Sequence, residues 1–179
     1  MAMLLTLLKR FALGLLGLLS IWFLIIVLMP KKSLWYEAEA LLVPKKVVIH
    51  GEQLDDRLLS LEVSDGELYL GALNVARIEK LSLMPLGLYN LLSVKNLFVG
   101  SELGLLKGLH IKHAHIAHLL FLTVSLEAEG NFGSLEGELD LDKHTLNLDI
   151  QPTAWLKKQT IVMSRLKKTA KGYHFAWHY

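Results

Sequence analysis

The stretch "SLEGELDLDKHTLNLDIQ", Ser134 to Gln151, decides the fold class of this chain. On both sides of the polar segment "DKH", apolar residues occupy every second position. An alternation with a period of two places apolar side chains on one face of a strand and polar side chains on the other. Two such runs joined by a short polar turn predict an antiparallel hairpin with one face in water.

The same alternation recurs from about Val47 to the C-terminus, where it predicts about eight strands with short connections. The run "LTVSLEAEG" and the turn "GNFG" precede the hairpin, and "TIVMSRLK" and "GYHFAWHY" are the last two predicted strands. The fold class is therefore mainly β, an antiparallel β-meander that forms a folded-over or half-open sheet. The apolar face of such a sheet has to be covered by the sheet itself, by a partner or by a lipid.

Glycine and proline predict where the meander turns. The pair Asp65-Gly66 is typical of a hairpin turn. Pro85 and Gly87 exclude a long helix in the apolar segment around residues 81–92. The segment "PTAWLKK", which begins at Pro152, predicts a single helical turn.

A membrane anchor is predicted before the sheet. The run "FALGLLGLLSIWFLIIVLM", Phe11 to Met29, has no charged residue, and as a helix it crosses the roughly 30 Å hydrocarbon core of a bilayer. It exceeds the apolar region of a cleaved signal peptide, and the nearest small-x-small site, Ala38-Glu39-Ala40, lies well beyond it. We therefore expect an uncleaved transmembrane helix. Its marker residues are Phe11, Trp22, Phe23 and Met29.

The charges beside this run favour one orientation. Lys9 and Arg10 favour a cytoplasmic N-terminus, although Lys31 and Lys32 on the far side oppose it. The predicted organisation is a short cytoplasmic tail at 1–10, the anchor at 11–29, a linker at 30–46 and an exported β-domain at 47–179.

Composition excludes several functions. The chain of 179 residues has no cysteine, which excludes disulfides, thiolate zinc sites and a cysteine nucleophile. A net charge of +2 does not indicate the strongly basic surface that is typical of nucleic-acid-binding proteins. We find no glycine-rich phosphate loop, nucleophile elbow or "HExxH". The acidic strand face of Glu136, Glu138, Asp140 and Asp142 is typical of a solvated surface. We expect no enzyme and no cofactor.

The segment "HIKHAHIAH" holds four histidines, His110, His113, His115 and His118. A strand from Leu109 to about His115, followed by a turn at "IAHLL", would place His113 and His115 on one face and His110 and His118 on the other, with Lys112. Two ligands on each face are fewer than a stable zinc site needs, unless His174 or His178 contributes another. A proton-sensitive patch is an alternative. A strand whose polar positions are histidines is the favoured interpretation.

The C-terminal run "GYHFAWHY" places four aromatic residues on one face, Tyr173, Phe175, Trp177 and Tyr179. This pattern predicts a last strand that covers the apolar face of the sheet. The alternative is an exposed edge that adds to the sheet of a partner.

The segment from Ser64 to Leu92 resembles the type II secretion system protein N family. It has a glycine-bounded strand followed by a segment like "P-L-x-L-L", at Gly66, Leu68, Gly71, Pro85, Leu86 and Leu88. The later "LEAEGNFGSLEGELDLDKHTLNLDI" resembles the hairpins of that family and of the broader AsmA-like anchored β-proteins.

This resemblance implies a single-pass protein of the bacterial inner membrane with a periplasmic β-domain. Its function would be that of a non-enzymatic accessory or scaffold component of a type II secretion-like apparatus, and the family brings no catalytic residues. The first alternative is an AsmA-like lipid-handling protein with an apolar sheet groove. The second is a histidine-based metal-binding protein. The expected partners are the membrane and either secretion-system proteins or lipid.

Overall fold

The computed structural model describes residues 2–119, 123–170 and 172–178, and the chain divides into the units Met1–Pro30 and Lys31–Tyr179. The first unit is helix α1 (Ala2–Leu28). Its segment Leu7–Leu28 is the one helix in the described ranges that is long and apolar enough to cross a membrane. The helix includes most of the predicted tail at 1–10, because no residue there breaks helical geometry.

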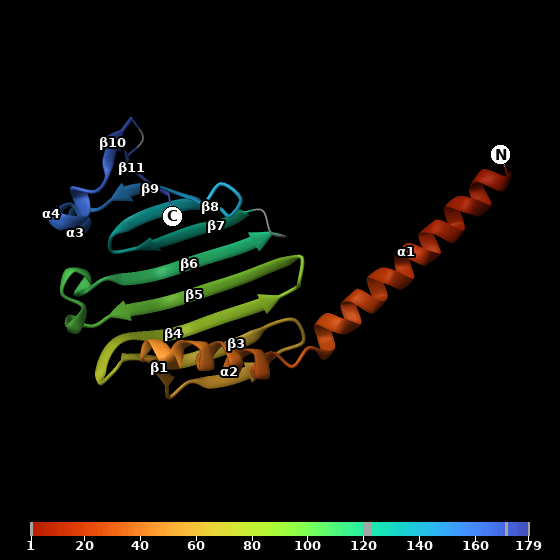
Figure 1. Cartoon of the computed structure of the whole chain (residues 1–179), viewed down its shortest axis with the longest axis horizontal. Coiled ribbons are helices and arrows are strands. Elements are labelled where there is room, and N and C mark those ends of the chain that lie inside the picture. Colours follow the sequence, from red (N-terminus) through yellow and green to blue (C-terminus); the bar gives the residue numbers. More distant parts are fainter. Residues whose placement is uncertain (1, 120–122, 171, 179) are drawn as a thin grey trace. The chain divides into compact units, whose positions relative to one another are not determined.

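The second unit is one antiparallel sheet of eleven strands (Figure 1). Its strands are β1 (Val47–His50), β2 (Gln53–Asp56), β3 (Leu61–Leu70), β4 (Leu73–Pro85), β5 (Tyr89–Val99), β6 (His110–Leu119), β7 (Thr123–Gly130), β8 (Gly133–Asp140), β9 (Thr145–Pro152), β10 (Lys167–Thr169) and β11 (Gly172–His178). From β3 to β9 each strand pairs with the next, β1 and β2 share the free side of β3, and β11 lies between β9 and β10. The predicted mainly β meander is confirmed.

The hairpin that decides the fold class forms as β8 and β9. Leu135 pairs with Ile150 and Leu139 with Leu146, so their side chains share one face. Leu141 was expected on the first strand, but β8 ends at Asp140, whose carboxylate accepts hydrogen bonds from the backbone N–H of Asp142 and Lys143. These bonds favour a turn over another ladder pair.

The segment predicted as a linker, 30–46, is mostly helical. It forms α2 (Lys31–Leu42) and the short 3-10 helix η1 (Val43–Lys45). Trp35 of α2 is buried in a core cluster with Leu61, Val63, Ile78 and Leu81. The linker prediction was wrong because one buried indole attaches α2 to the apolar face of β3 and β4.

Two further expectations differ from the structure. "TIVMSRLK" forms not a strand but the one-turn helix α4 (Thr160–Met163), which follows α3 (Ala154–Lys157). Val162 and Met163 pack there against a second core cluster of Phe132, Ile150 and Leu156. The single turn predicted at "PTAWLKK" is confirmed as α3. Asp65-Gly66 lies inside β3 and is not a hairpin turn, since β3 continues to Leu70.

A row of irregular positions crosses four strands, at Asp65, Glu79, Asn96 and Lys112. The regular pairs on either side are Ser64–Lys80 and Gly66–Ile78, then Lys95–His113 and Leu97–Ile111. Asp65 and Asn96 have the left-handed φ values of 56° and 50°. Between β6 and β7 the extra residue becomes a bulge, because Ile111 pairs with Gly130 and His113 with Glu129. In these strands, the apolar residues on either side of the irregular position therefore lie three positions apart in the sequence and still point to the same face of the sheet.

Candidate functional site: an apolar groove on the sheet

The candidate site is a groove on the face of the sheet that α2 partly covers. It has a volume of 410 Å³ and lies over the middle strands, β5 to β9. Its floor consists of side chains that the pleat and the irregular row bring to one face. These are Val94, Leu97, Ile111, Ala114, Ile116, Leu126, Ala128, Leu135 and Ile150.

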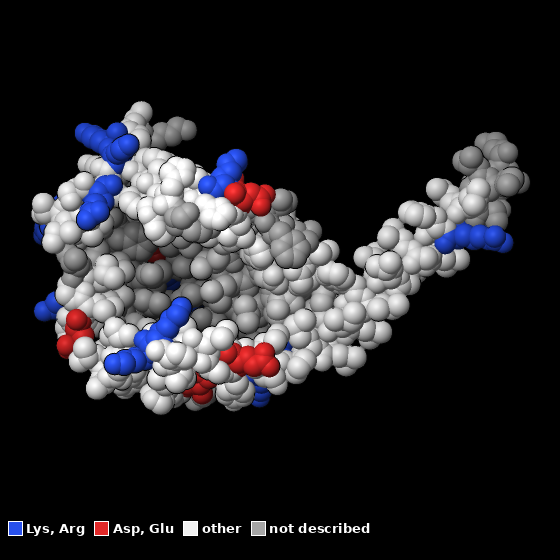
Figure 2. Space-filling model, viewed as in Figure 1, with Lys and Arg blue, Asp and Glu red and all other residues white. Residues whose placement is uncertain are grey.

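The wall of the groove comes from connections between strands. The short helix η2 (Ser101–Leu106) and the residues after it contribute Leu106 and Leu109, while α3 and α4 contribute Trp155, Leu156 and Val162. Gln159 is the one lining residue with a polar side chain. Figure 2 shows the hollow in this face, and most of the charged side chains of the domain that are visible in this view lie around the rim of the hollow.

This composition limits the chemistry of the groove. An apolar lining has no hydrogen bonds to offer, so a polar ligand would lose its hydration without compensation. An apolar ligand loses nothing and gains about 0.8 kcal/mol for each buried CH₂. The volume of 410 Å³ lies in the range of about 300–1,000 Å³ that is usual for small-molecule sites. The groove is suited to binding a hydrocarbon chain.

The four histidines of β6 do not divide as predicted. The irregularity at Lys112 brings Ile111 and Ala114 to the groove, so His110, His113 and His115 all lie on the opposite, outer face. His110 stacks on Phe98 with ring centroids 4.2 Å apart, and His115 Nδ1 lies 2.9 Å from Ser93 Oγ.

Of the four histidines, only His118 lies on the groove face, with Ala114 and Ile116, because the regular alternation of faces resumes after the bulge. Its Nε2 is buried and has no hydrogen-bond partner among the described residues. A turn was expected at "IAHLL", but β6 continues to Leu119, so the strand is longer than predicted.

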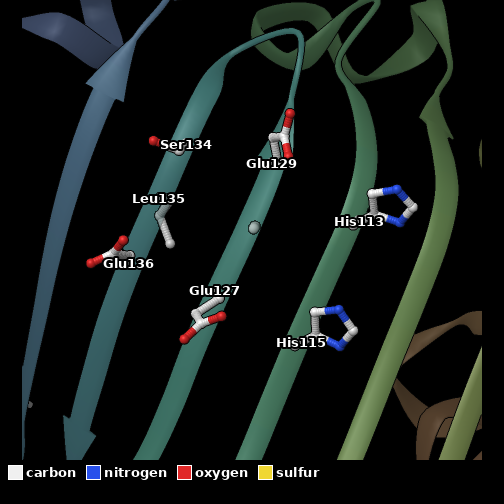
Figure 3. Close-up of a pocket in the computed structure, with 8 residues that line it drawn as sticks. His113, His115, Glu127, Glu129, Ser134, Leu135 and Glu136 are labelled. Carbon is white, nitrogen blue, oxygen red and sulfur yellow. The ribbon is translucent and has the colours of Figure 1, made fainter.

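The outer face carries a shallow pocket of 330 Å³ with a row of ionisable groups (Figure 3). His115 pairs with Glu127 across β6 and β7, and Glu127 with Glu136 across β7 and β8. The row continues to Asp149 and then to His174, whose Nδ1 lies 3.0 Å from Asp149 Oδ1. In the parts of the chain that the structure describes, no three His, Asp or Glu side chains are placed to hold a metal ion. The outer face is an exposed ionic surface.

The last strand does not cover the apolar face of the sheet but joins the sheet beside β9 and extends that face. Tyr173 pairs with Ile150, Phe175 with Leu148 and Trp177 with Leu146, so the aromatic face continues the apolar face of β9. β10 pairs with residues 172–174 of β11, so β11 is not the edge strand over that part. Tyr179, the fourth aromatic residue of the prediction, lies outside the described residues.

The predicted anchor residues lie on or directly after α1. Phe11 and Phe23 are well exposed, and Trp22 and Met29 are partly exposed. Exposed apolar side chains along a helix of this length fit a lipid environment.

Sequence reasoning predicted the apolar face but missed the residues that wall the groove. Phe132, Trp155 and Val162 come from turns and short helices whose packing no local pattern specifies. The apolar face had a readable signal, an apolar spacing of three at Ile78 and Leu81 under α2 and again at Val94 and Leu97 in the groove floor. Within an alternating strand, that spacing indicates a bulge. Comparisons of this chain with protein-family models, curated proteins and solved structures found no match.

Proposed function

We propose that this protein is a membrane-anchored, non-enzymatic lipid-binding protein whose groove holds an acyl chain. The groove is the observation that carries the proposal, because fifteen of its sixteen lining residues are apolar. Helix α1 supports it, since its 22-residue apolar segment would keep the sheet domain beside a bilayer. An acyl chain has no polar group to satisfy, and Gln159 is the one polar side chain among the lining residues.

The test is photocrosslinking in membranes with a phospholipid that carries a diazirine on its acyl chain. In the full-length protein we expect adducts on β6, β7 and α3, mapped by mass spectrometry of peptides. Ala114→Phe places a ring in the groove and should reduce these adducts several-fold. Ala117→Phe is the matched control, because Ala117 follows the groove residue Ile116 and lies on the outer face.

Circular dichroism of both variants establishes that the sheet is intact. Groove adducts that persist in Ala114→Phe, or adducts confined to α1, would refute acyl-chain binding. Adducts on α1 together with an empty groove would leave the anchor in place and remove the lipid-binding function.

A second candidate function is an accessory component of a type II secretion-like apparatus. The family resemblance supports it, and its glycine-bounded hairpins are adjacent strands here, β7 to β9. In this proposal α1 crosses the bacterial inner membrane with the N-terminus in the cytoplasm and the sheet in the periplasm. A reporter enzyme fused to the C-terminus tests the orientation, and a cytoplasmic signal would overturn it. Copurification of secretion components with the full chain, without bound lipid, would favour this candidate.

A further inference from the structure

The sheet has one end at which the chain enters the domain, here termed the entry end. Antiparallel pairing brings to it the β2–β3, β4–β5 and β8–β9 connections and, among the described residues, the end of β6 at Leu119 and the start of β7 at Thr123 (Figure 1). Lys31, the first residue of the domain, also lies there, because its Nζ donates a hydrogen bond to Asp56 Oδ1 at 3.2 Å. Asp56 pairs with Leu61 and closes the β2–β3 connection.

The covalent chain keeps this end close to the end of α1. Helix α1 ends at Leu28, and Lys31 follows three residues later. Three residues of extended chain span at most about 11 Å. If α1 crosses a bilayer, Lys31 therefore stands within about 11 Å of the end of the helix, and the β2–β3 corner of the entry end lies next to Lys31.

Large apolar side chains are exposed at the entry end. Leu58 lies in the β2–β3 turn, Leu88 and Tyr89 lie at the β4–β5 turn, and Leu119 ends β6. They are between 42% and 62% exposed. Such residues at hairpin tips are costly in water and stable at the boundary between headgroups and acyl chains.

The charges at the entry end are compatible with that boundary. Arg57 pairs with Glu62 at 2.8 Å and with Asp55 at 3.2 Å, and Lys143 pairs with Asp140 at 2.7 Å. Paired charges need less water than isolated ones, and the headgroup layer is itself polar.

The opposite end of the sheet provides the contrast. Leu70 and Leu73 flank the β3–β4 turn there and are 43% and 50% exposed, which matches Leu88 and Tyr89 at the entry end. A strand of the ten residues that β3 contains separates the two ends by about 33 Å. Exposure is equal at both ends, so only the covalent connection to α1 distinguishes the entry end from the opposite end.

We propose that the turns of the entry end lie in the headgroup layer of the same bilayer that α1 crosses, with Leu58, Leu88, Tyr89 and Leu119 directed into it. This inference rests on the proposed membrane anchor. It also gives the groove a direction, because η2, α3 and α4 wall the groove at the other end of the strands. Leu92, Val124 and Leu146 continue the apolar face from the groove toward the bilayer. Each lies an even number of positions from a groove residue on its own strand and therefore points to the same face.

The absence of cysteine makes a direct test available. Leu88→Cys and Leu119→Cys report on the entry end, Leu73→Cys is the matched control at the opposite end, and Leu15→Cys reports on α1. Each full-length variant is labelled with a polarity-sensitive dye and reconstituted in vesicles of phosphatidylcholine and phosphatidylglycerol in equal parts. Quenching by a headgroup-level spin-labelled lipid is compared with quenching by aqueous iodide.

We expect the lipid-borne quencher to act several-fold more strongly on the Leu88 and Leu119 dyes than on the Leu73 dye, with the reverse order for iodide. Equal quenching at Leu88 and Leu73, together with lipid quenching at Leu15, would overturn this inference and retain the anchor. Loss of lipid quenching at Leu15 would overturn the anchor and this inference with it. Leu58→Cys replaces any entry-end variant whose circular dichroism shows that it does not fold.

Discussion

Trp35 is the residue whose removal best tests the packing of α2 on the sheet. Its indole is 8% exposed and contacts the cluster that contains Leu61, the most buried large side chain of the core. Trp35→Ala removes the indole and leaves a cavity between α2 and the sheet. If 31–42 were a flexible linker, the same substitution would have no consequence for stability.

The expected loss of stability in Trp35→Ala follows from two opposing effects. A buried tryptophan removes about 150–250 Å² from water, which is worth about 4–6 kcal/mol at about 25 cal/mol per Å². Against this, Trp35 Nε1 is buried without a hydrogen-bond partner among the described residues, at a cost of about 1–3 kcal/mol. The expected net loss in the free energy of unfolding is about 3 kcal/mol, the lower end of the usual range for Trp→Ala.

The unpaired N–H gives a second, sharper expectation. Trp35→Phe keeps most of the apolar contact and removes the unsatisfied donor, so it should change the free energy of unfolding by less than about 1.5 kcal/mol. Tyr36→Ala is the matched control, since Tyr36 is 56% exposed, and it should change stability by less than about 0.5 kcal/mol.

Thermal and urea unfolding of the full chain in detergent micelles, followed by circular dichroism of the sheet, measures these differences. For a chain of this size, a loss of about 3 kcal/mol lowers the Tm by about 6–12 °C. An unchanged Tm for Trp35→Ala would refute the packing of α2. A loss in Trp35→Phe as large as that in Trp35→Ala would refute the reasoning about the indole N–H.

Three further predictions concern single features. Burial, followed by repulsion from Glu52, raises the pKa of Glu39 above its ordinary value, while His50 lowers it. The stability that this carboxyl contributes is therefore full below about pH 4 and is lost as pH rises through the raised pKa. Glu39→Gln should have the same urea midpoint as the wild type at about pH 4 and a higher midpoint at about pH 7. A lower midpoint for Glu39→Gln than for the wild type at about pH 7 would contradict the raised pKa. Gly133 has φ +121°, and a Cβ there would collide with the carbonyl oxygen of Gln151. Gly133→Ala should therefore destabilise the chain by more than Gly71→Ala, which meets open space and costs about 1–2 kcal/mol of backbone strain; equal losses in urea unfolding would contradict this. The full chain incubated with zinc and passed through gel filtration should retain none by elemental analysis, because the described residues offer no three-ligand group. Stoichiometric zinc that His113→Ala removes would contradict that expectation.

The sequence anticipated the meander because its signals are local. The alternation across Ser134 to Gln151 fixes which face of β8 and β9 is apolar, and the turn follows from Asp140 and its neighbours. The long uncharged run in α1 is equally local, since helix length and hydropathy need no other part of the chain. The apolar stripe of β11 was predicted for the same reason.

The groove was beyond such reasoning. Its walls come from η2, α3 and α4, and α4 is helical although its residues have strand-like character. Val162 packs against Phe132 and Ile150, which are distant in sequence, and this contact outweighs the weak local preference. The positions of the histidines depended on the same level of structure, because one bulge moves His110 to the outer face.

By its own pattern, the sequence determined that this protein has one apolar helix and an antiparallel sheet with one apolar face. Neighbouring residues along the chain are enough to set a period of two or an uncharged run. Only the tertiary structure decided that α2 is part of the core, that the irregular row changes the facing of β3 to β6, and that a groove opens on the sheet. Each of these depends on contacts between residues far apart in the chain, where packing free energy exceeds local preference.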